Sequence, residues 1–207
     1  MPSSSVAQAV RDLAKRLQEA ELAYGQGTLN AHDEAAWLVL WAAGLPLDTD
    51  LDFAPDLSHE QRTRLDDLIS RRITQRLPTA YLTGEAWLQG VPFHIDSRSI
   101  VPRSLIAEIL ASGWIDDALG QSPRLVMDMC CGNGSLAVLS TLAWPETKVV
   151  GADISADALS LAQRNAQRHS VADRITWLVS DGWQAVATEP LFDLVLCNPP
   201  YVADGRM

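Results

Sequence analysis

The sequence predicts an α/β protein in which a doubly wound parallel sheet follows a small helical domain and a β-hairpin. Three observations lead to this prediction. Apolar residues recur every three or four positions before residue 84, which is typical of helices. Two short apolar runs around a glycine come next, which is typical of a hairpin. After Pro123, short apolar runs alternate with helical segments, as in a parallel sheet whose strands are joined by crossover helices.

The first 84 residues predict a small bundle of helices. The first helix is expected over 6–22, where valines and leucines repeat with a helical period. The second, over 35–43, is apolar on all sides and is therefore expected to be buried. The third begins at Ser58, which forms a capping box with Gln61, and ends before Pro78. Nothing in this bundle is typical of a catalytic site.

A change of pattern after residue 84 predicts a linker, 85–104, built on a β-hairpin. Its two apolar runs flank Gln89-Gly90, a dipeptide suited to a tight turn. A helix is expected over 105–119. The rest of the second domain, 105–207, contains the strand and helix alternation. Its strands are expected at 125–129, 148–153, 174–180 and 192–197, and its helices at 135–144 and 155–169.

The amino-acid composition argues against several classes of protein. Of the 207 residues, 47% are hydrophobic and 20% are charged, which suits a globular core rather than a disordered chain. The net charge of −10 argues against a protein that binds DNA or RNA directly, because such proteins carry a basic face. The sequence has no run of eighteen apolar residues and opens with no secretory leader, so we expect a cytoplasmic protein without a membrane span. Three cysteines and four scattered histidines predict no metal site.

A glycine-rich turn and a following acid predict a site for an adenosine-containing cofactor. The turn is Cys130-Cys131-Gly132-Asn133-Gly134, between an expected strand and an expected helix. Glycines there allow positive φ angles and a close approach of the backbone to a ligand. Asp153 ends the next strand, where a carboxylate can accept hydrogen bonds from ribose hydroxyls. Because Gly132 to Ala137 also fits G-x-G-x-x-A, a dinucleotide-dependent oxidoreductase remains an alternative.

Three further side chains are expected near the same cofactor. Asp128 lies in the strand before the turn, where an acid could hold a cationic amino group. Asp181 and Trp183 follow the third strand, where they offer a carboxylate for the adenine amine and an aromatic ring for its face. All of these residues are expected at the carboxyl ends of strands, where open α/β sheets bind ligands.

The most specific motif is Asn198-Pro199-Pro200-Tyr201, which follows the fourth strand. Successive prolines fix the backbone and remove two donors, which leaves carbonyl oxygens free to accept hydrogen bonds. The Asn198 and Pro199 carbonyls can together bind an NH₂ group, and the Tyr201 ring can stack on a planar amide or base. Such a pair of acceptors can orient a weakly nucleophilic amide or exocyclic amine for methylation.

With these motifs, the sequence resembles the amino-methyltransferases that use S-adenosylmethionine, and more narrowly the bacterial protein-glutamine methyltransferases. The linker carries this resemblance in Ala80-Tyr81-Leu82-Thr83-Gly84-Glu85 and in Val101-Pro102-Arg103. Tyr24-Gly25-Gln26-Gly27-Thr28 and Asp33-Glu34-Ala35 are similar to the branch that modifies ribosomal large-subunit protein three. So is the stretch from Pro102 to Glu108. The resemblance implies a Rossmann-like class I methyltransferase sheet, with 1–84 as the domain that recognises the substrate protein.

The resemblance also implies a role for each site residue. Asp128, Cys130, Gly132 and Gly134 would hold the methionine part of S-adenosylmethionine, Asp153 the ribose, and Asp181 and Trp183 the adenine. Asn198, Pro199, Pro200 and Tyr201 would hold the glutamine amide, and Arg103 would touch the substrate. Cys130 replaces the family's first turn glycine, so strain is expected if its φ angle is positive. Cys197 is expected to be a small buried hydrophobic residue.

The family's sheet continues with further strands, so the resemblance also implies a C-terminally truncated chain that contains the first four strands. Its last strand would then be an exposed edge, and the activity of this short chain stays open. The alternatives are a release-factor glutamine methyltransferase, the dinucleotide-dependent oxidoreductase, a DNA adenine methyltransferase and a truncated, non-catalytic binding module. Charge and linker disfavour the DNA enzyme. The oligomeric state and the target glutamine are not assigned.

Overall fold

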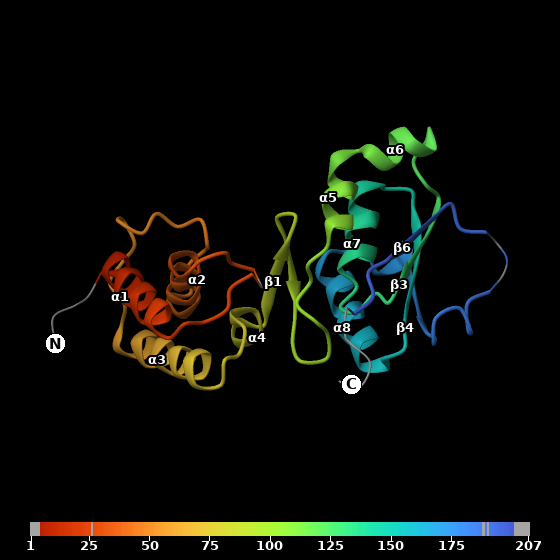
Figure 1. Ribbon diagram of the computed structural model, residues 1–207. Coiled ribbons are helices and arrows are strands. Elements are labelled where there is room, and N and C mark those ends of the chain that lie inside the picture. The colour runs from red at the N-terminus through yellow and green to blue at the C-terminus, as the bar shows by residue number, and fades with distance from the viewer. Residues whose placement is uncertain (1–4, 26, 188, 190, 201–207) are drawn as a thin grey trace. The chain divides into compact units, whose positions relative to one another are not determined.

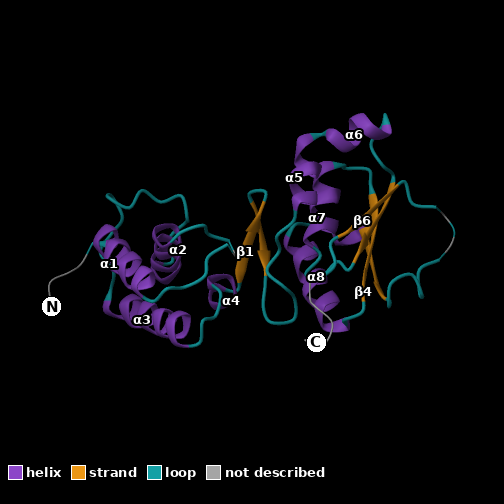
Figure 2. Ribbon diagram, in the orientation of Figure 1, coloured by secondary structure: helices purple, strands orange, loops and turns teal. Residues whose placement is uncertain are grey.

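The computed structural model describes residues 5–25, 27–187, 189 and 191–200. It divides the chain into two compact units, Met1–Gly84 and Glu85–Met207 (Figure 1). The first unit is helical, and the second contains all the described strands (Figure 2). In the part of the chain that the structure describes, no helix is long and apolar enough to cross a membrane.

The first unit is a helical bundle with a continuous apolar core. Its helices are α1 (Val6–Glu19), α2 (Ala31–Ala43), α3 (His59–Thr74) and α4 (Thr79–Thr83). Ser58 and Gln61 form the predicted capping box at the start of α3. The α2 helix buries residues on all sides, including Leu38 and Val39, as its uniformly apolar sequence predicts.

A buried ion pair joins α2 to α3 inside this bundle. Arg72 donates hydrogen bonds to both carboxylate oxygens of Glu34, and its guanidinium also donates to the carbonyl of Ala23. Each side chain is about 95% buried. Because a buried charge without a partner is strongly destabilising, this pair fixes the relative position of α2, α3 and the segment that follows α1.

The second unit begins with an antiparallel hairpin, in which β1 (Glu85–Leu88) pairs with β2 (Val91–His94). Two short helices follow, α5 (Leu105–Ser112) and α6 (Trp114–Leu119). The expectation of one helix over 105–119 is therefore wrong. Gly113 has a φ angle of 75° and separates the two helices, since a left-handed residue cannot continue a right-handed helix.

The remaining elements alternate as the sequence predicts, and they form a parallel sheet with the order β5-β4-β3-β6. They are β3 (Leu125–Met129), α7 (Ser135–Ala143), β4 (Lys148–Asp153), α8 (Ala156–Arg168), the short 3₁₀ helix η1 (Ala172–Arg174), β5 (Ile175–Val179) and β6 (Leu194–Cys197). The predicted α/β class is confirmed. The β6 strand lies at an edge of the described sheet, where Val195 is 45% exposed.

The main core of the second unit lies between the sheet and the helices α5, α7 and α8, which cover the same face (Figures 1 and 2). Val126, Val149 and Leu196 point from the strands into this core. The opposite face carries a smaller apolar cluster around Met127 and Met129. Side chains alternate between faces along a strand, so Asp128 points with Val126 toward α7.

One aromatic ring in this core depends on two glycines. The Trp177 ring of β5 lies over Gly151 of β4 and beside Gly134, the residue before α7. A Cβ atom added to Gly151 would come within 2.4 Å of this ring, and one added to Gly134 within 2.6 Å. Both glycines are therefore required by the close packing of Trp177.

We predict that Gly151→Ala destabilises the second unit by about 1–3 kcal/mol, because the ring must move out of a well-packed site. Urea unfolding followed by circular dichroism measures the change. The double variant Gly151→Ala, Trp177→Leu is the control, since the smaller side chain leaves room for the new methyl group. If the double variant loses as much stability as Gly151→Ala and Trp177→Leu lose in sum, contact with the Trp177 ring is not the cause of the Gly151→Ala effect.

Candidate functional site

The sheet brings the predicted cofactor and substrate motifs to one edge. Met129 at the end of β3 lies opposite Ala152 of β4 on one side and Cys197 of β6 on the other. Asp153 in turn lies opposite Val179 at the end of β5. The turn after β3, Asp153, the segment after β5 and Asn198 therefore meet at the carboxyl ends of four neighbouring strands, where such sheets bind ligands.

Asp153 holds the glycine-rich turn in place. Its Oδ2 accepts a hydrogen bond of 2.8 Å from the Gly132 amide, and its Oδ1 accepts one of 2.9 Å from the Ser155 amide. The carboxylate thus ties the turn to the start of α8. Each oxygen has a second lone pair, and the residue is partly exposed, so the carboxylate can still accept hydrogen bonds from a ligand hydroxyl.

The two glycines of the turn both have positive φ angles, but nearby side chains also restrict them. Gly132 has a φ angle of 54°, and a Cβ atom there would come within 2.8 Å of the Ser99 hydroxyl. Gly134 packs against Trp177 and Ala162. The sequence analysis explained these glycines by the close approach of a ligand to the backbone. The structure adds a second reason, since the linker and α8 press against the same turn.

Cys130 has a φ angle of 57°, in the left-handed region that a non-glycine residue rarely adopts. The positive angle that would imply strain is therefore present at the position where the family's glycine is replaced. Strain at a non-glycine residue persists when the surrounding structure fixes the backbone. Here the amide of the next residue, Cys131, donates to the Ala152 carbonyl, and the Gly134 amide closes the turn onto the Cys131 carbonyl.

Asp128, which is expected near the methionine part of the cofactor, is buried. It is 1% exposed, and its Oδ2 accepts a hydrogen bond of 2.9 Å from the Ala137 amide in the first turn of α7. Its Oδ1 is buried and has no hydrogen-bond partner among the described residues. Burial, with a further contribution from the charge of Asp153, raises the Asp128 pKa to about 7. Asp128 therefore lies behind the turn, where it positions α7.

A residue that the sequence did not single out connects the turn to the hairpin. Asn165 of α8 is fully buried. Its Oδ1 accepts from the His94 amide at 2.7 Å, and its Nδ2 donates to the carbonyls of His94 at 3.0 Å and Asn133 at 2.9 Å. An asparagine on the apolar face of α8, next to Leu161, Ala162 and Ala166, was the available signal in the sequence.

On the substrate side, a backbone group orients the first residue of the proline motif. Asn198 Nδ2 donates a hydrogen bond of 3.1 Å to the carbonyl of Arg103. Because the amide nitrogen is used in this way, Oδ1 is left to accept from another group. Arg103 was expected to act through its exposed side chain, but its backbone carbonyl makes the contact to the motif. Pro199 and Pro200 are exposed, and Tyr201 lies outside the described residues.

The predicted adenine residues follow β5. Asp181 and Trp183 are both exposed, and Trp183 is 54% exposed. The Trp183 ring lies 6.3 Å from the Phe192 ring in a tilted arrangement, which leaves part of its surface open to a planar group. Cys197 is also exposed, so the expectation that it is a small buried residue is wrong.

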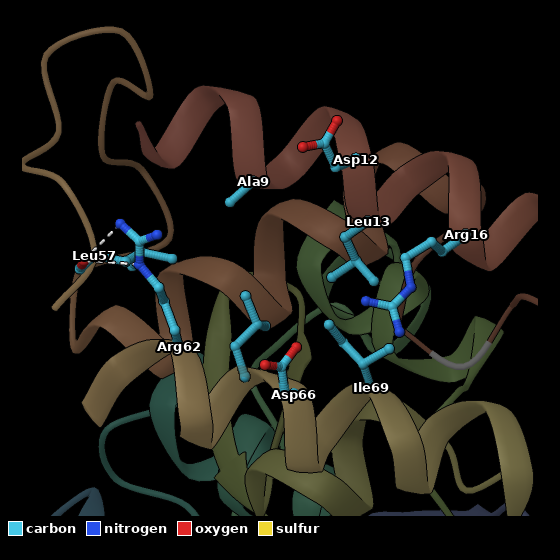
Figure 3. A pocket seen from close by; sticks show the side chains of 9 residues that line it. Ala9, Asp12, Leu13, Arg16, Leu57, Arg62, Asp66 and Ile69 are labelled. Atoms are coloured by element: carbon cyan, nitrogen blue, oxygen red, sulfur yellow. Dashed lines mark hydrogen bonds between the residues drawn. The ribbon is translucent and has the colours of Figure 1, made fainter. Parts of the chain in front are cut away.

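Elsewhere in the described chain, the first unit has a cavity of about 190 Å³ between α1 and α3 (Figure 3). Its floor is apolar, with Leu13 and Ile69, and the charged residues Asp12, Arg16 and Asp66 surround it. It contains none of the predicted site residues. Within the described residues, no cluster of histidine, cysteine or acidic side chains is suited to a metal ion.

Comparison with known proteins defines the class first. Residues 110–207 match the family model of the methyltransferase small domain. Among solved structures, the chain is similar to the "delta-N METTL16 MTase domain", with a TM-score of 0.46 and 19% identity over 56% of this chain and 54% of that chain. It is also similar to an S-adenosylmethionine-dependent methyltransferase from Geobacter sulfurreducens, with a TM-score of 0.36 and 23% identity over 44% of this chain and 35% of that chain.

Curated relatives define the family more narrowly. The chain is 46% identical to a ribosomal protein uL3 glutamine methyltransferase of Bordetella pertussis, over 97% of this chain and 69% of the relative. It is 39% identical to the enzyme of the same name in Burkholderia pseudomallei, over 100% of this chain and 70% of the relative. The chain belongs to the family of uL3 glutamine methyltransferases. The resemblance to the large-subunit protein three branch, rather than to the release-factor branch, is confirmed.

We predict that Asp128→Asn removes one source of pH dependence in the stability of the second unit. In wild type the folded Asp128 pKa of about 7 lies above the ordinary aspartate value of 3.8. The Asp128 contribution is therefore present below pH 4 and is lost as the pH rises through 7. Relative to wild type, the free energy of unfolding of the Asp128→Asn variant should rise by about 2–4 kcal/mol between pH 4 and pH 8. Urea unfolding across this range measures it, and a constant difference would place the folded Asp128 pKa near its ordinary value.

We predict that Asn165→Ala destabilises the second unit by about 2–4 kcal/mol, because it removes the hydrogen bonds to the backbone groups of His94 and Asn133. At a temperature where the variant remains folded, S-adenosylhomocysteine should also bind more weakly by calorimetry, since the turn is less firmly held. Ser160→Ala, on the exposed face of the same helix, is the matched control. Normal binding by a folded Asn165→Ala variant would limit Asn165 to a structural role.

Proposed function

We propose that this chain uses S-adenosylmethionine to methylate the side-chain amide nitrogen of a glutamine in ribosomal protein uL3, in the cytoplasm. Family membership supports the methyltransferase chemistry and the cofactor. The observation that carries the substrate chemistry is the orientation of Asn198. Its nitrogen is held by the Arg103 carbonyl, so its oxygen is available to a substrate NH₂ group.

The residues at the sheet edge fit this cofactor. Asp153 is partly exposed and has free lone pairs for the ribose hydroxyls. The turn from Cys130 to Gly134 would lie against the methionine part, and Asp181 and Trp183 would flank the adenine. The buried Oδ1 of Asp128 lies behind the turn, where it has no hydrogen-bond partner among the described residues. When bound, S-adenosylmethionine supplies an electrophilic methyl group on a positively charged sulfur.

The protein's own contribution to the reaction is orientation. An amide nitrogen is a weak nucleophile because its lone pair is delocalised into the carbonyl. Two acceptors, Asn198 Oδ1 and the Pro199 carbonyl, would accept its two N–H groups and stabilise the positive charge that develops on the nitrogen. Tyr201 would stack on the amide plane. Such a site needs no general base before the methyl group is transferred.

The first unit is suited to recognise the protein substrate. The segment between α2 and α3 carries four exposed carboxylates around Phe53, which is 87% exposed: Asp48, Asp50, Asp52 and Asp56. No lysine or arginine occurs between residues 17 and 61. Opposite charge across an interface speeds association with a basic partner such as a ribosomal protein. We therefore assign the choice of uL3 to residues 1–84 and the chemistry to the sheet.

The test is transfer of a labelled methyl group from S-adenosylmethionine to purified uL3, to a release factor and to DNA, assayed separately. Label on one glutamine of uL3, located by peptide mass spectrometry, is the expected result. Label on the release factor alone would place the chain in the other branch. Label on DNA alone, or binding of S-adenosylhomocysteine with no transfer to any of the three, would contradict the proposal.

We predict that Asn198→Ala lowers the rate of methyl transfer about 10²–10³-fold, the scale expected for loss of one preorganised polar contact. Binding of S-adenosylhomocysteine should change little. Asn198→Asp should also be slow, because it loses the N–H donor and brings a carboxylate oxygen against the Arg103 carbonyl. Arg103→Ala is the matched control, since it keeps that carbonyl and should lose much less activity. Equal losses in Asn198→Ala and Arg103→Ala would assign the contact to the arginine side chain.

A further inference from the structure

Two cysteine thiols lie side by side at the candidate site. Cys130 is the first residue after β3, and Cys197 is the last residue of β6. These strands are paired in parallel, with Met129 directly opposite Cys197. The Cys197 thiol is close enough to the Cys130 thiol to be one of the groups that raise its pKa. Both cysteines are free, so they form a dithiol that bridges the cofactor turn and the start of the proline motif.

The positions of the two residues suit a disulfide. Neighbouring strands lie about 4.8 Å apart, and a disulfide requires Cα atoms about 4.4–6.8 Å apart. Cys130 is one residue beyond Met129, the residue directly opposite Cys197, so the two cysteines are diagonal neighbours on adjacent strands. The third cysteine, Cys131, is buried. Its sulfur faces Gly151 of β4, which makes it a natural internal control.

The two thiols differ in access to solvent. Cys197 is exposed and Cys130 is partly buried. Burial is the main cause that raises the Cys130 pKa, with Cys197 and Asp153 adding to it. Oxidation of a thiol depends on its exposure, so the first reaction belongs to the exposed Cys197. Cys130 is then correctly placed to attack the oxidised sulfur.

We propose that Cys130 and Cys197 form a site of reversible oxidation by hydroperoxides. In the first step the Cys197 thiolate attacks the peroxide, the O–O bond breaks, and sulfenic acid and an alcohol or water are formed. In the second step the Cys130 sulfur displaces the hydroxyl group of the sulfenic acid. The S–S bond forms and one water molecule leaves. The pair loses two electrons and two protons, and the peroxide is reduced.

The disulfide changes the candidate site. It draws together the first residue of the glycine-rich turn and the residue before Asn198, and it acts on Cys130, whose backbone already has a φ angle of 57°. The Gly132 contact to Asp153 and the Asn198 contact to Arg103 both lie within two residues of the new bond. We therefore expect the oxidised chain to bind the cofactor more weakly, a consequence that rests on the proposed function.

The experiment treats the full chain with hydrogen peroxide, blocks the remaining thiols by alkylation, and maps disulfides by mass spectrometry. A Cys130–Cys197 cross-link that dithiothreitol reverses is expected, with Cys131 alkylated only after unfolding. Calorimetry with S-adenosylhomocysteine should show at least about tenfold weaker binding by the oxidised chain, restored by the reductant. Cys197→Ser should form no cross-link and should keep its binding affinity after peroxide treatment.

Three results would overturn the proposal. One is oxidation of Cys197 to sulfinic or sulfonic acid with no cross-link. The second is a cross-link that includes Cys131 in place of Cys130. The third is a Cys130–Cys197 cross-link that leaves binding unchanged. If the reduced chain itself failed to bind S-adenosylhomocysteine, the proposed function would fail, while the mass measurement would still decide whether the dithiol is oxidised as a pair.

Discussion

The buried side-chain amide of Asn165 is the interaction on which the architecture of the site depends. It satisfies both backbone groups of His94 and the carbonyl of Asn133. A hairpin, a turn and a helix that are far apart in sequence are thereby held at one point. All three partners are backbone atoms, so the contact does not depend on the side chains of His94 and Asn133. The geometry of the glycine-rich turn is therefore set from behind, by α8, as well as by Asp153 at the sheet edge.

The substrate side is held in a similar way. The Arg103 carbonyl orients Asn198, and it belongs to the segment that connects the hairpin to α5. The same segment supplies Ser99, whose hydroxyl lies close to Gly132. One stretch of the linker thus contacts both the cofactor turn and the first residue of the proline motif. This arrangement links the position of the predicted methyl donor to the position of the predicted acceptor without a direct contact between the two motifs.

The sequence predicted the elements because their signals are local: helical period, a capping box, apolar runs and glycine turns. It also predicted that Asp153 and Asn198 would share an edge, since parallel strands end together. It missed Asn165, whose partner His94 lies 71 positions away. It could not show that Asp128 is buried and turned toward α7, because this depends on how the strand packs. It also treated Cys197 as buried, although it expected the last strand to be an exposed edge, where side chains are open to solvent.

The charges around the turn favour a cation at this edge. Burial is the main cause that raises the pKa of Asp128, and the charge of Asp153 adds to it, so the two carboxylates repel each other when Asp128 is ionised. The Oδ1 of Asp128 has no described donor to offset this penalty. A positive charge near the turn reduces both penalties at once. The same positive charge would be less well stabilised in a neutral pocket. A turn backed by two acids is therefore suited to a cationic group such as the sulfonium of S-adenosylmethionine.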